Sequence, residues 1–370
     1  MSKRILFICN ETVTVINFRS ELIRYLTKHD YIIDVLCADD KRTKEIKDMG
    51  VDNVYVVSFA NRGINPFTLR KLEKEFIKVI KLAKHDIVFT FESKPNVIGA
   101  IAAHKCKINN IVSMVEGLGN PFMPTNFKGR ILRKIAVRYY KKAFKHNKLV
   151  IFLNNDDKKE CLDRKIVKEE QTLVIPGIGI DTNLIKAVAS LPKEKKVVML
   201  CRLTKNKGIE DFCKVAELVR KERKDISFEL YGDEQDVKKE DLQKYIDNGS
   251  IVYGGFTNNP LDIIAQSTIY ISTSFYREGF PRTLLEAMAL AKPIIATDTV
   301  GSRDAIKDGV NGYMLHIHDV YAFKDKILDI IDDEKELTRI GESARKYCEE
   351  NYQSDVINEV ILKHLDLISK

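Results

Sequence analysis

No stretch of this chain approaches the roughly 18 consecutive apolar residues that a membrane-spanning helix requires, so any membrane association is expected to be peripheral. The seven cysteines are scattered and show no Cys-x-x-Cys spacing, which argues against a disulfide framework and a zinc site and indicates a reducing cytoplasm. The chain starts with a basic tip and a short apolar run, which predicts a first strand and not a signal peptide. We find neither an internal repeat nor a low-complexity tract.

Metal ligands do not cluster in the sequence either. His316 and His318 would share one face of an extended segment, but no carboxylate or cysteine cluster accompanies them, so no metal site is expected there. The remaining histidines are expected at helix or loop surfaces: His29, His85, His104, His146 and His364.

The two halves of the chain carry opposite net charges. Residues 1–180 contain 33 Lys and Arg against 20 Asp and Glu, a net +13, whereas residues 181–370 contain 28 against 33, a net −5. Within the first half, residues 128–148 carry nine basic residues and no acid, interleaved with apolar ones. This pattern is typical of a basic helix, which either lies on an anionic lipid surface or presents a solvated face.

Short apolar runs alternate with longer amphipathic ones, as in parallel βαβ units, and the length of 370 residues favours two domains. The first half predicts strands over 4–9, 32–37, 54–58, 87–91, 111–115 and 149–153, with helices over 18–28, 68–83 and 96–106. After a polar stretch at 181–196, the second half predicts strands over 197–201, 227–231, 251–254, 269–273, 293–297 and 312–315. We therefore expect two doubly wound α/β domains with a cleft between them, and a closing helix over 355–370.

Conspicuous polar residues and glycines follow the predicted strands of the second half, where doubly wound sheets bind their ligands. They are Arg202, Gly232, residues 254–256 and Glu278. Arg202 and Lys207 lie five positions apart, and Gly208 marks the entry into the next helix. The two cations could neutralise a leaving diphosphate, although a solvated loop is the alternative.

Glu278 and Glu286 flank a turn, Gly279-Phe280-Pro281, that is expected to open a helix. With Pro281 in the first helical turn, the amides of Thr283 and Leu284 would be unpaired and would face an anion such as phosphate. Each glutamate could accept paired hydrogen bonds from vicinal hydroxyls, one pair on a transferred sugar and the other on a ribose. The alternative is a surface acid and an N-terminal helix acid stabilised by the helix dipole.

Residues 277–289, with 292–298 and Gly301, look like the donor-site signature of the retaining family 4 glycosyltransferases, which have the GT-B fold. Arg202 and Lys207 match the diphosphate pair of that family. The likeness covers nearly the whole chain and resembles the bacterial surface-polysaccharide branch, including the N-acetylgalactosaminyltransferases that act on undecaprenyl-diphosphate sugars. It is carried by residues 94–96 with Gly99, 116–119, 152–157 and 177–181.

The resemblance implies two Rossmann-like domains facing each other across a cleft. Residues 1–185 would bind the acceptor, residues 186–352 would bind the nucleotide-sugar donor, and residues 353–370 would form a helix that packs back on the first domain. It also implies retention of anomeric configuration and independence from a metal or other cofactor. The lack of a convincing Asp-x-Asp motif or histidine cluster agrees with metal independence.

Carried over residue by residue, the resemblance assigns the donor sugar to Glu278, the ribose diol to Glu286 and the phosphates to Arg202 and Lys207. It completes the donor site with Gly254, Phe256 and Thr257 near the base and with Gly279, Phe280, Pro281, Thr283 and Leu284 in the turn. The acceptor residues are expected to be Arg19, Glu92, Lys94, Asn96 and Glu116. The catalytic candidates are Glu278, Arg202, Lys207 and Glu116.

The first domain departs from the wider family. Many members have a Gly-Gly loop after the first strand and a histidine near the reacting carbon. This chain has no glycine in residues 10–14, and Glu92 and Glu116 occupy the comparable strand ends. Glu116 is therefore a candidate for positioning or deprotonating the acceptor, and a helix-capping or structural acid is the alternative.

The resemblance, together with these residues, implies transfer of an N-acetylhexosamine or hexose from a UDP-linked donor to a lipid-linked (polyprenyl diphosphate) saccharide in surface glycan or capsule synthesis. The enzyme would work peripherally on the cytoplasmic face of the membrane, with Lys128 to Lys148 on the anionic lipid. Two alternatives stay open. A sugar-nucleotide 2-epimerase of similar architecture would carry acid/base carboxylates and a histidine in its cleft. A basic nucleic-acid-binding protein would use the +13 half, which lacks aromatic stacking platforms or a recognised module.

Overall fold

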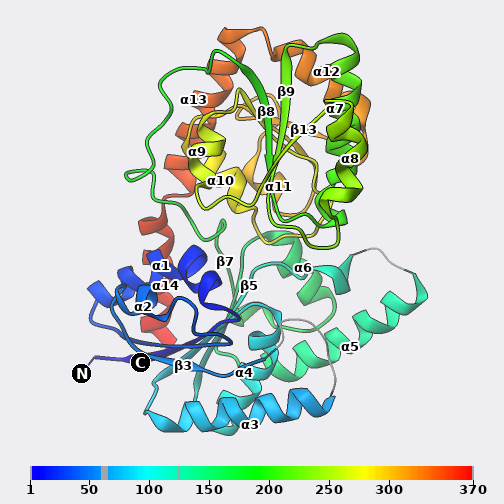
Figure 1. The fold of residues 1–370 in the computed structure, drawn as a ribbon. Coiled ribbons are helices and arrows are strands. Elements are labelled where there is room, and N and C mark those ends of the chain that lie inside the picture. Colours follow the sequence, from blue (N-terminus) through cyan, green and yellow to red (C-terminus); the bar gives the residue numbers. More distant parts are fainter. Residues whose placement is uncertain (1, 60–65, 124–125, 369–370) are drawn as a thin grey trace. The chain divides into compact units, whose positions relative to one another are not determined.

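The computed structural model describes residues 2–59, 66–123 and 126–368, which fold into two compact α/β units (Figure 1). Unit 1 comprises Met1–Ile178 and Ser354–Lys370, and unit 2 comprises Gly179–Gln353. Each unit has one sheet in which every paired strand is parallel, so the predicted doubly wound α/β class is confirmed.

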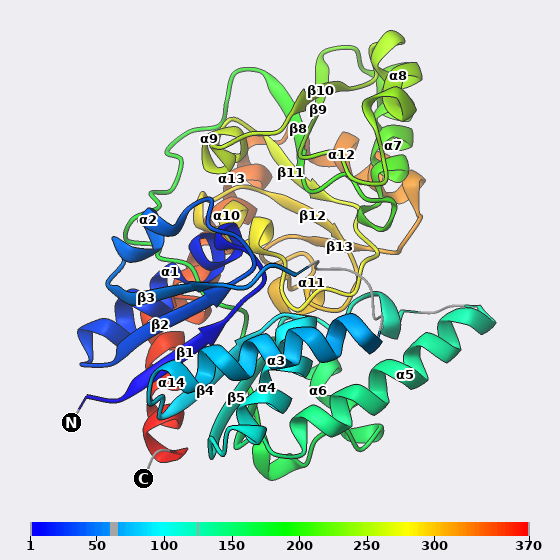
Figure 2. The same cartoon turned by 60° about the horizontal axis from the view of Figure 1, so that its bottom comes forward.

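The sheet of unit 1 has the strand order β3-β2-β1-β4-β5-β6-β7. Helices α1 and α14 cover one face, and α3, α4 and α5 cover the other (Figures 1 and 2). The strands are β1 Arg4–Ile8, β2 Ile32–Cys37, β3 Val51–Val56, β4 Ile87–Phe91, β5 Asn110–Val115, β6 Leu149–Phe152 and β7 Thr172–Val174. The helices are α1 Thr12–Lys28, α2 Thr43–Lys47, α3 Pro66–Leu82, α4 Ser93–Lys105, α5 Phe127–Phe144, α6 Asn155–Asp163 and α14 Ser354–Ile368, with 3₁₀ turns η1 Asn120–Phe122 and η2 Glu169–Gln171.

The sheet of unit 2 has the order β10-β9-β8-β11-β12-β13. Its strands are β8 Lys195–Leu200, β9 Ile226–Tyr231, β10 Val252–Gly255, β11 Ile269–Ser272, β12 Ile294–Thr297 and β13 Tyr313–Leu315. Its helices are α7 Ile209–Glu222, α8 Lys239–Asp247, α9 Pro260–Ala265, α10 Arg282–Ala289, α11 Ser302–Ala305, α12 Val320–Ile330 and α13 Glu334–Asn351, with the 3₁₀ turn η3 Lys205–Lys207. Helices α7, α8 and α12 gather on one face, and α9, α10 and α13 on the other (Figure 1).

The structure moves or adds several predicted elements. Strand β3 begins before the predicted range 54–58 and also ends before that range does. Strand β7 was not predicted, because its three residues are all half-buried and show no alternation of buried and exposed side chains. Helix α1 begins at Thr12, six residues before the predicted start, because the Asp39 carboxylate accepts bonds from the Thr12 amide (3.0 Å) and hydroxyl (2.5 Å). Of the predicted closing helix, Ser369 and Lys370 lie outside the described residues.

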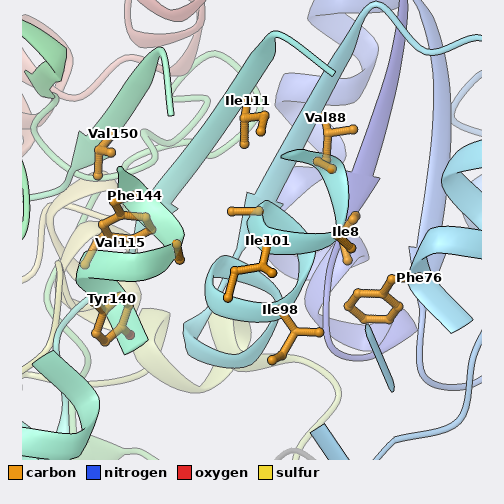
Figure 3. Close-up of a cluster of buried hydrophobic side chains, with 14 of the residues drawn as sticks. Ile8, Phe76, Val88, Ile98, Ile101, Ile111, Val115, Tyr140, Phe144 and Val150 are labelled. Carbon is orange, nitrogen blue, oxygen red and sulfur yellow. The ribbon is translucent and has the colours of Figure 1, made fainter. Parts of the chain in front are cut away.

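The core of unit 1 forms where α3, α4 and α5 pack on the sheet (Figure 3). Phe76 of α3 and Phe144 of α5 are fully buried, and aliphatic side chains of α4 lie with them over the strands. Truncating either ring to alanine would leave a cavity that costs about 3–5 kcal/mol. The labelled residues of this layer are Ile8, Phe76, Val88, Ile98, Ile101, Ile111, Val115, Tyr140, Phe144 and Val150.

His85 was predicted on the surface, and this prediction is wrong. The ring is fully buried, and its Nε2 lies 2.9 Å from Oδ2 of Asp34, a buried carboxylate that also accepts from Nη1 of Arg4 at 2.9 Å. The buried Asp34 carboxylate gives the ring a hydrogen-bond partner inside the unit, which the local sequence around His85 does not reveal.

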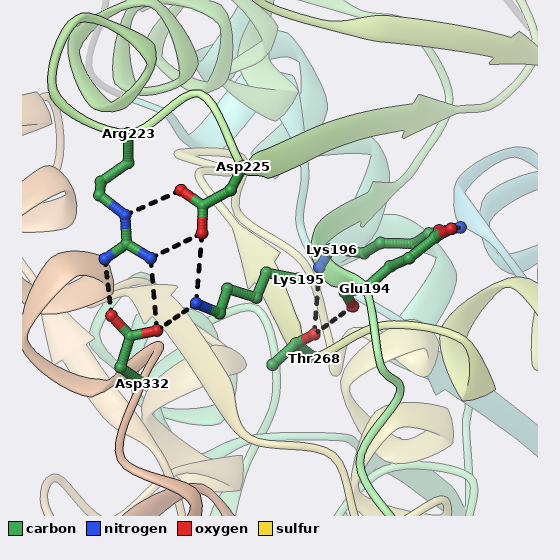
Figure 4. A network of polar contacts seen from close by, with 7 residues as sticks. All are labelled: Glu194, Lys195, Lys196, Arg223, Asp225, Thr268 and Asp332. Atoms are coloured by element: carbon green, nitrogen blue, oxygen red, sulfur yellow. Dashed lines mark hydrogen bonds and ion pairs between the residues drawn. The ribbon is translucent and has the colours of Figure 1, made fainter.

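Ion pairs hold the amino-terminal edge of the unit 2 sheet (Figure 4). Arg223 donates from Nε to Asp225 at 2.8 Å and from Nη1 to Asp332 at 2.6 Å, and Lys195 pairs with both carboxylates. These side chains are partly exposed, so each pair contributes little to stability. Figure 4 also shows Thr268, whose hydroxyl accepts a hydrogen bond from the Lys196 amide at 3.0 Å. This bond helps to hold β11 in register beside β8.

Lys292, between α10 and β12, is a lysine with 1% exposure whose ammonium donates to the Ser267 carbonyl at 2.9 Å. Burial lowers the pKa of Lys292 to about 8, because no described carboxylate lies within ion-pair distance to offset the lost hydration. The charged form is therefore less favourable in the folded chain than in the unfolded one.

We expect Lys292→Met to change how stability depends on pH. In the wild type, between pH 8 and the unfolded pKa near 10.5, the unfolded chain binds more protons than the folded chain. Stability should therefore rise with pH across that window, by at most roughly 3 kcal/mol. The variant should lack this rise in denaturant unfolding measured from pH 7 to 10.5, and Lys221→Met, at an exposed position, should keep it. If the free energy of unfolding depends on pH in the same way in the wild type and in Lys292→Met, the lowered pKa of Lys292 is contradicted.

Candidate functional site

Arg202 and Glu278 follow β8 and β11, and Glu92 follows β4, all of them strands at the reversal of strand order in their sheets. In unit 2, β8 lies between β9 and β11, and in unit 1, β1 lies between β2 and β4. Doubly wound sheets bind ligands outside the carboxyl ends of such strands, because the loops after them leave in opposite directions.

In unit 2, an ion pair joins the loop after β8 to the loop after β11. The ammonium of Lys207 pairs with Oε1 of Glu278, and the hydroxyl of Ser274 donates to the same oxygen at 3.3 Å. The two charged side chains are 15% and 19% exposed, so their attraction is screened less than at an open surface. The structure thus brings together Lys207 and Glu278, which the sequence separates by 71 positions.

The backbones of the same two loops are also joined. The amide of Phe275 donates to the Asn206 carbonyl at 3.0 Å, and the hydroxyl of Thr273 donates to the Gly208 carbonyl at 2.8 Å. Gly208 has φ 73°, and a Cβ there would lie 1.9 Å from the Thr273 carbonyl oxygen. Only glycine therefore allows η3 and α7 to approach β11 this closely.

The turn after β12 supports the Glu278 loop from a third strand. Gly301 has φ 89°, and a Cβ there would lie 3.0 Å from the Glu278 carbonyl oxygen and 2.9 Å from that of Gly279. Thr297, at the end of β12, donates to the Ser274 carbonyl. The position of Glu278 is therefore set by backbone contacts on both sides.

Helix α10 begins one residue later than predicted, and the predicted anion site changes with it. Pro281 directly precedes the helix with φ −70° and ψ 114°, and the Leu284 amide donates to the Pro281 carbonyl at 3.2 Å. The prediction that the Leu284 amide is unpaired is therefore wrong. Thr283 lies in the first turn of α10 and Leu284 is buried.

Glu286 lies in the second turn of α10 and is buried. The Nε of Arg282 donates to its Oε1 at 3.1 Å. Burial raises the pKa of Glu286 although Arg282 opposes the shift. Phe280 of the predicted donor motif packs edge-on against Tyr352, with ring centroids 5.0 Å apart.

The remaining predicted donor residues lie along the same edge of the unit 2 sheet. Arg202 follows β8, and its exposed side chain makes no ion pair with any residue that the structure describes. Gly254 lies in β10, Phe256 follows that strand with 68% exposure, and the Thr257 hydroxyl accepts from the Asn259 amide at 3.0 Å. Strand β10 lies three strand positions from β11, or roughly 14 Å, at the far end of the edge.

In unit 1, Arg19 of α1 is 1% exposed, and its guanidinium pairs with Glu116, which follows β5. The same guanidinium donates from Nη1 to the Phe18 carbonyl at 2.8 Å, and its central carbon lies 4.2 Å from the centroid of the Phe91 ring. These contacts hold a rigid cation under the strand ends.

Glu92 follows β4 beside Glu116, and its Oε2 accepts from the Asn10 amide at 2.9 Å. Burial, reinforced by the Glu116 carboxylate, raises the pKa of Glu92 to about 7. The sequence-predicted Arg19, Glu92 and Glu116 are therefore one cluster.

Lys94 and Asn96 lie in the first turns of α4. Lys94 is partly exposed, and burial lowers its pKa. Asn96 is buried, its Oδ1 accepts from the Thr90 hydroxyl at 2.7 Å and its Nδ2 donates to the Met114 carbonyl at 2.7 Å. Both ends of this amide are therefore occupied inside the unit, so Asn96 supports the strand ends, and its contact with an acceptor stays a prediction.

Sequence reasoning missed residues that contact the site directly, Ser274 and Tyr276 through their side chains and Asn10 through its backbone amide. Ser274 and Tyr276 flank Lys207 and Glu278, the Tyr276 ring centroid lying 5.9 Å from the Lys207 ammonium, and Asn10 contacts Glu92. Asn10 and Ser274 lie two positions after β1 and β11, so the strand-end rule that selected Arg202 would have found them.

Within residues 2–59, 66–123 and 126–368, no group of three or more His, Cys, Asp or Glu side chains could hold a metal ion. Metal independence stays a prediction. In the same part of the chain, no helix combines the length and the apolar character needed to cross a bilayer.

Two glycosyltransferase families match the chain, one over each unit. The family described as glycosyl transferases group 1 matches residues 181–347, and the family described as glycosyl transferase 4-like matches residues 4–154.

Characterised relatives and a solved structure match most of the chain. The N,N'-diacetylbacillosaminyl-diphospho-undecaprenol alpha-1,3-N-acetylgalactosaminyltransferase of Campylobacter jejuni is 25% identical over 99% of both chains. The UDP-Gal:alpha-D-GlcNAc-diphosphoundecaprenol alpha-1,3-galactosyltransferase of Escherichia coli is 24% identical over 83% of this chain and 82% of its own. The Anabaena protein HepE, solved with UDP and glucose, superimposes with a TM-score of 0.79 at 20% identity, covering 99% of this chain and 100% of its own.

We expect Gly208→Ala to destabilise unit 2 by roughly 2–4 kcal/mol, because the new methyl would meet the Thr273 carbonyl in a left-handed conformation. Urea unfolding measures this loss. Gly309→Ala is the matched control, since Gly309 has φ 69° with nothing within 4 Å of the added Cβ, and should cost only the left-handed conformation itself, about 1–2 kcal/mol. Equal losses in the two variants would show that the close approach of the loops is not what requires glycine.

Proposed function

We propose, from the premise that this chain belongs to the glycosyltransferases with the GT-B fold, that it transfers a sugar from a UDP-linked donor to a lipid-linked saccharide in surface polysaccharide synthesis. The names of the Campylobacter and Escherichia relatives, which act on undecaprenyl-diphosphate sugars, support this acceptor class. They also support an N-acetylhexosamine or hexose as the transferred sugar. The observation that carries the proposal is the Lys207–Glu278 pair at the strand reversal of unit 2.

In this proposal, unit 2 binds the donor along the carboxyl edge of its sheet. The diphosphate lies beside Lys207 and Arg202, Glu278 accepts hydroxyls of the sugar, and Glu286 accepts the ribose diol. The base lies toward Gly254, Phe256 and Thr257, three strand positions away, so that an extended nucleotide spans the edge. The Gly279-Phe280-Pro281 turn and Thr283 border the diphosphate.

The Lys207–Glu278 pair suits an anionic ligand because each partner neutralises the other until the ligand arrives. A diphosphate brings more negative charge to the ammonium than one carboxylate does, and a released Glu278 carboxylate gains hydroxyl donors from the sugar. As the bond to the sugar breaks, negative charge grows on the departing diphosphate, and Lys207 and Arg202 stabilise it. Attack on the face from which the diphosphate leaves accounts for the proposed retention of configuration without a covalent nucleophile.

Unit 1 is proposed to meet the acceptor at an anionic membrane surface through α5. The carboxyl-terminal half of this helix is docked by buried Tyr140, Ala143 and Phe144, whereas its amino-terminal half lies at the periphery of unit 1 (Figures 1 and 2). Exposed apolar side chains recur there at helical spacing, between basic residues and without an acid: Phe127, Ile131, Leu132 and Ile135. An apolar stripe flanked by cations favours an interfacial helix over a solvated one.

We expect Lys207→Ala to lower kcat/KM by roughly 10²–10³-fold, because the departing diphosphate loses its nearest cation. The measurement is release of UDP from UDP-N-acetylgalactosamine, UDP-galactose and UDP-glucose in the presence of a polyprenyl-diphosphate-linked saccharide. The neighbouring Lys205→Ala, at an exposed position, should stay within about twofold of the wild type. Near-normal turnover of a folded Lys207→Ala protein would reject the phosphate role.

We expect the combined Lys134→Glu, Arg138→Glu, Lys141→Glu and Lys142→Glu variant to lose sedimentation with vesicles that contain anionic lipid, because each exposed cation near the surface contributes about 1 kcal/mol. A control with the same charge change on unit 2 reverses Lys221, Lys224, Lys238 and Lys239, all exposed. It should sediment like the wild type. If both variants lose binding equally, net charge and not α5 accounts for membrane attachment.

A further inference from the structure

His318 lies in the loop after β13, outside the donor motif. It directly precedes Asp319, whose carboxylate accepts from the Ala322 amide at 3.0 Å and caps α12. The φ of His318 is 66°, in the left-handed region that histidine adopts more readily than most side-chain-bearing residues do. Helix α12 packs beside α7 (Figure 1), and the loop that carries His318 contacts the start of α7.

The imidazole of His318 is bonded to the first turn of α7. Its Nδ1 lies 2.7 Å from Oδ2 of Asp211, whose side chain is 15% exposed. A carboxylate accepts hydrogen bonds and does not donate them, so Nδ1 is the nitrogen that carries the hydrogen. Asp211 lies in the turn that follows Lys207 and Gly208. The bond therefore ties the loop after β13 to the segment that carries Lys207.

The same ring packs against the loop after β11. The ring centroids of His318 and Phe275 lie 4.9 Å apart, with the ring planes at 59°. Phe275 precedes Glu278 in that loop, and its amide donates to the Asn206 carbonyl at 3.0 Å. The imidazole therefore bridges the segment that carries Lys207 and the loop that carries Glu278.

This bridge is independent of the charges that a ligand would displace. When a diphosphate takes the Lys207 ammonium and sugar hydroxyls take the Glu278 carboxylate, the two loops lose the ion pair that joins them in the ligand-free chain. The contacts of His318 use neither of these charged groups. They therefore persist in the bound state, where the spacing of Lys207 and Glu278 still has to match the ligand.

We propose that His318 is a positioning residue of the donor site, which holds the Glu278 loop against the start of α7 while the donor is bound. This inference rests on the function proposed above and concerns unit 2 alone. His318 acts through Asp211 and Phe275 and does not touch the donor. Because a small misplacement of binding groups weakens every contact that depends on their spacing, loss of the bridge should weaken donor binding.

The test is the His318→Ala variant of the full chain, with the binding of UDP and of UDP-N-acetylgalactosamine measured by calorimetry. We expect the Kd of both to rise by roughly 5–10-fold, because a partly exposed bond to a carboxylate contributes less than a buried one. The kcat/KM for the donor should fall by a similar factor. The melting temperature of the ligand-free protein should change by less than about 2 °C, since the His318 side chain is 60% exposed.

Three further variants show whether the bridge itself is responsible. His318→Asn keeps a side-chain donor and readily adopts the same backbone region, so it should recover part of the affinity for UDP. Asp211→Ala should also weaken UDP binding, and the double variant should be no weaker than His318→Ala alone. His316→Ala, at an exposed position in the same loop, is the matched control and should bind UDP like the wild type.

The outcomes separate this inference from the proposed function. If the wild type binds UDP and His318→Ala binds it equally well, the inference alone is overturned, and a lower melting temperature with that unchanged affinity would mark the bridge as merely structural. Additive losses in His318→Ala and Asp211→Ala would show that the two residues act separately, which also overturns it. A wild type that binds neither UDP nor any donor of the UDP-sugar panel overturns the proposed function and this inference with it.

Discussion

The ion pair between Lys207 and Glu278 is the contact on which the donor edge of unit 2 depends. It spans the reversal of strand order and joins loops that leave β8 and β11 in opposite directions. Both side chains are largely removed from water, so either charge without its partner would be costly to keep there. The backbone contacts of Gly208 and Gly301 fix where the two charges meet, but they do not neutralise them. A ligand that separates the pair must therefore supply compensating groups to both members, and a sugar diphosphate carries hydroxyls for the one and phosphates for the other.

Patterns of local hydrophobicity predict most of the fold, because each parallel strand is buried on both faces and each helix on one. Fold class, strand sequence and the entry into α7 at Gly208 follow from that rule. Two of the failures arise where a distant residue decides, and the third comes from the exact start of a helix. The start of α1 is set by Asp39, the burial of His85 by Asp34, and the partner of the Leu284 amide by a one-residue shift of α10. None of these contacts leaves a trace in the residues beside the affected position.

In the candidate site too, local sequence predicts some features and tertiary contacts decide the others. The strand-end rule selects Arg202, Glu278, Glu92 and Glu116, which follow their strands in the structure, and matches to two glycosyltransferase families decide against the epimerase and nucleic-acid alternatives. The roles of these residues could be predicted only through resemblance. That Asn96 lies beneath the edge and not on it depends on Thr90 and Met114, and the strained backbone of Glu92, with a φ of 60°, depends on how β4 meets α4. The sequence identifies which residues lie at the carboxyl edge of a sheet. Packing decides which of their side chains can still contact a ligand.

The two units balance their glutamates with different cations, and the difference fits the ligands proposed for them. Arg19 is buried, paired with Glu116, bonded to a backbone carbonyl and set over the Phe91 ring, so it cannot move to follow a ligand. Lys207 is a point charge on a flexible stem, and it can exchange a carboxylate for a phosphate by rotating. A fixed cation suits a neutral hydroxyl, which needs geometry but brings no charge. An exchangeable cation suits a diphosphate, which arrives with charge and leaves with more.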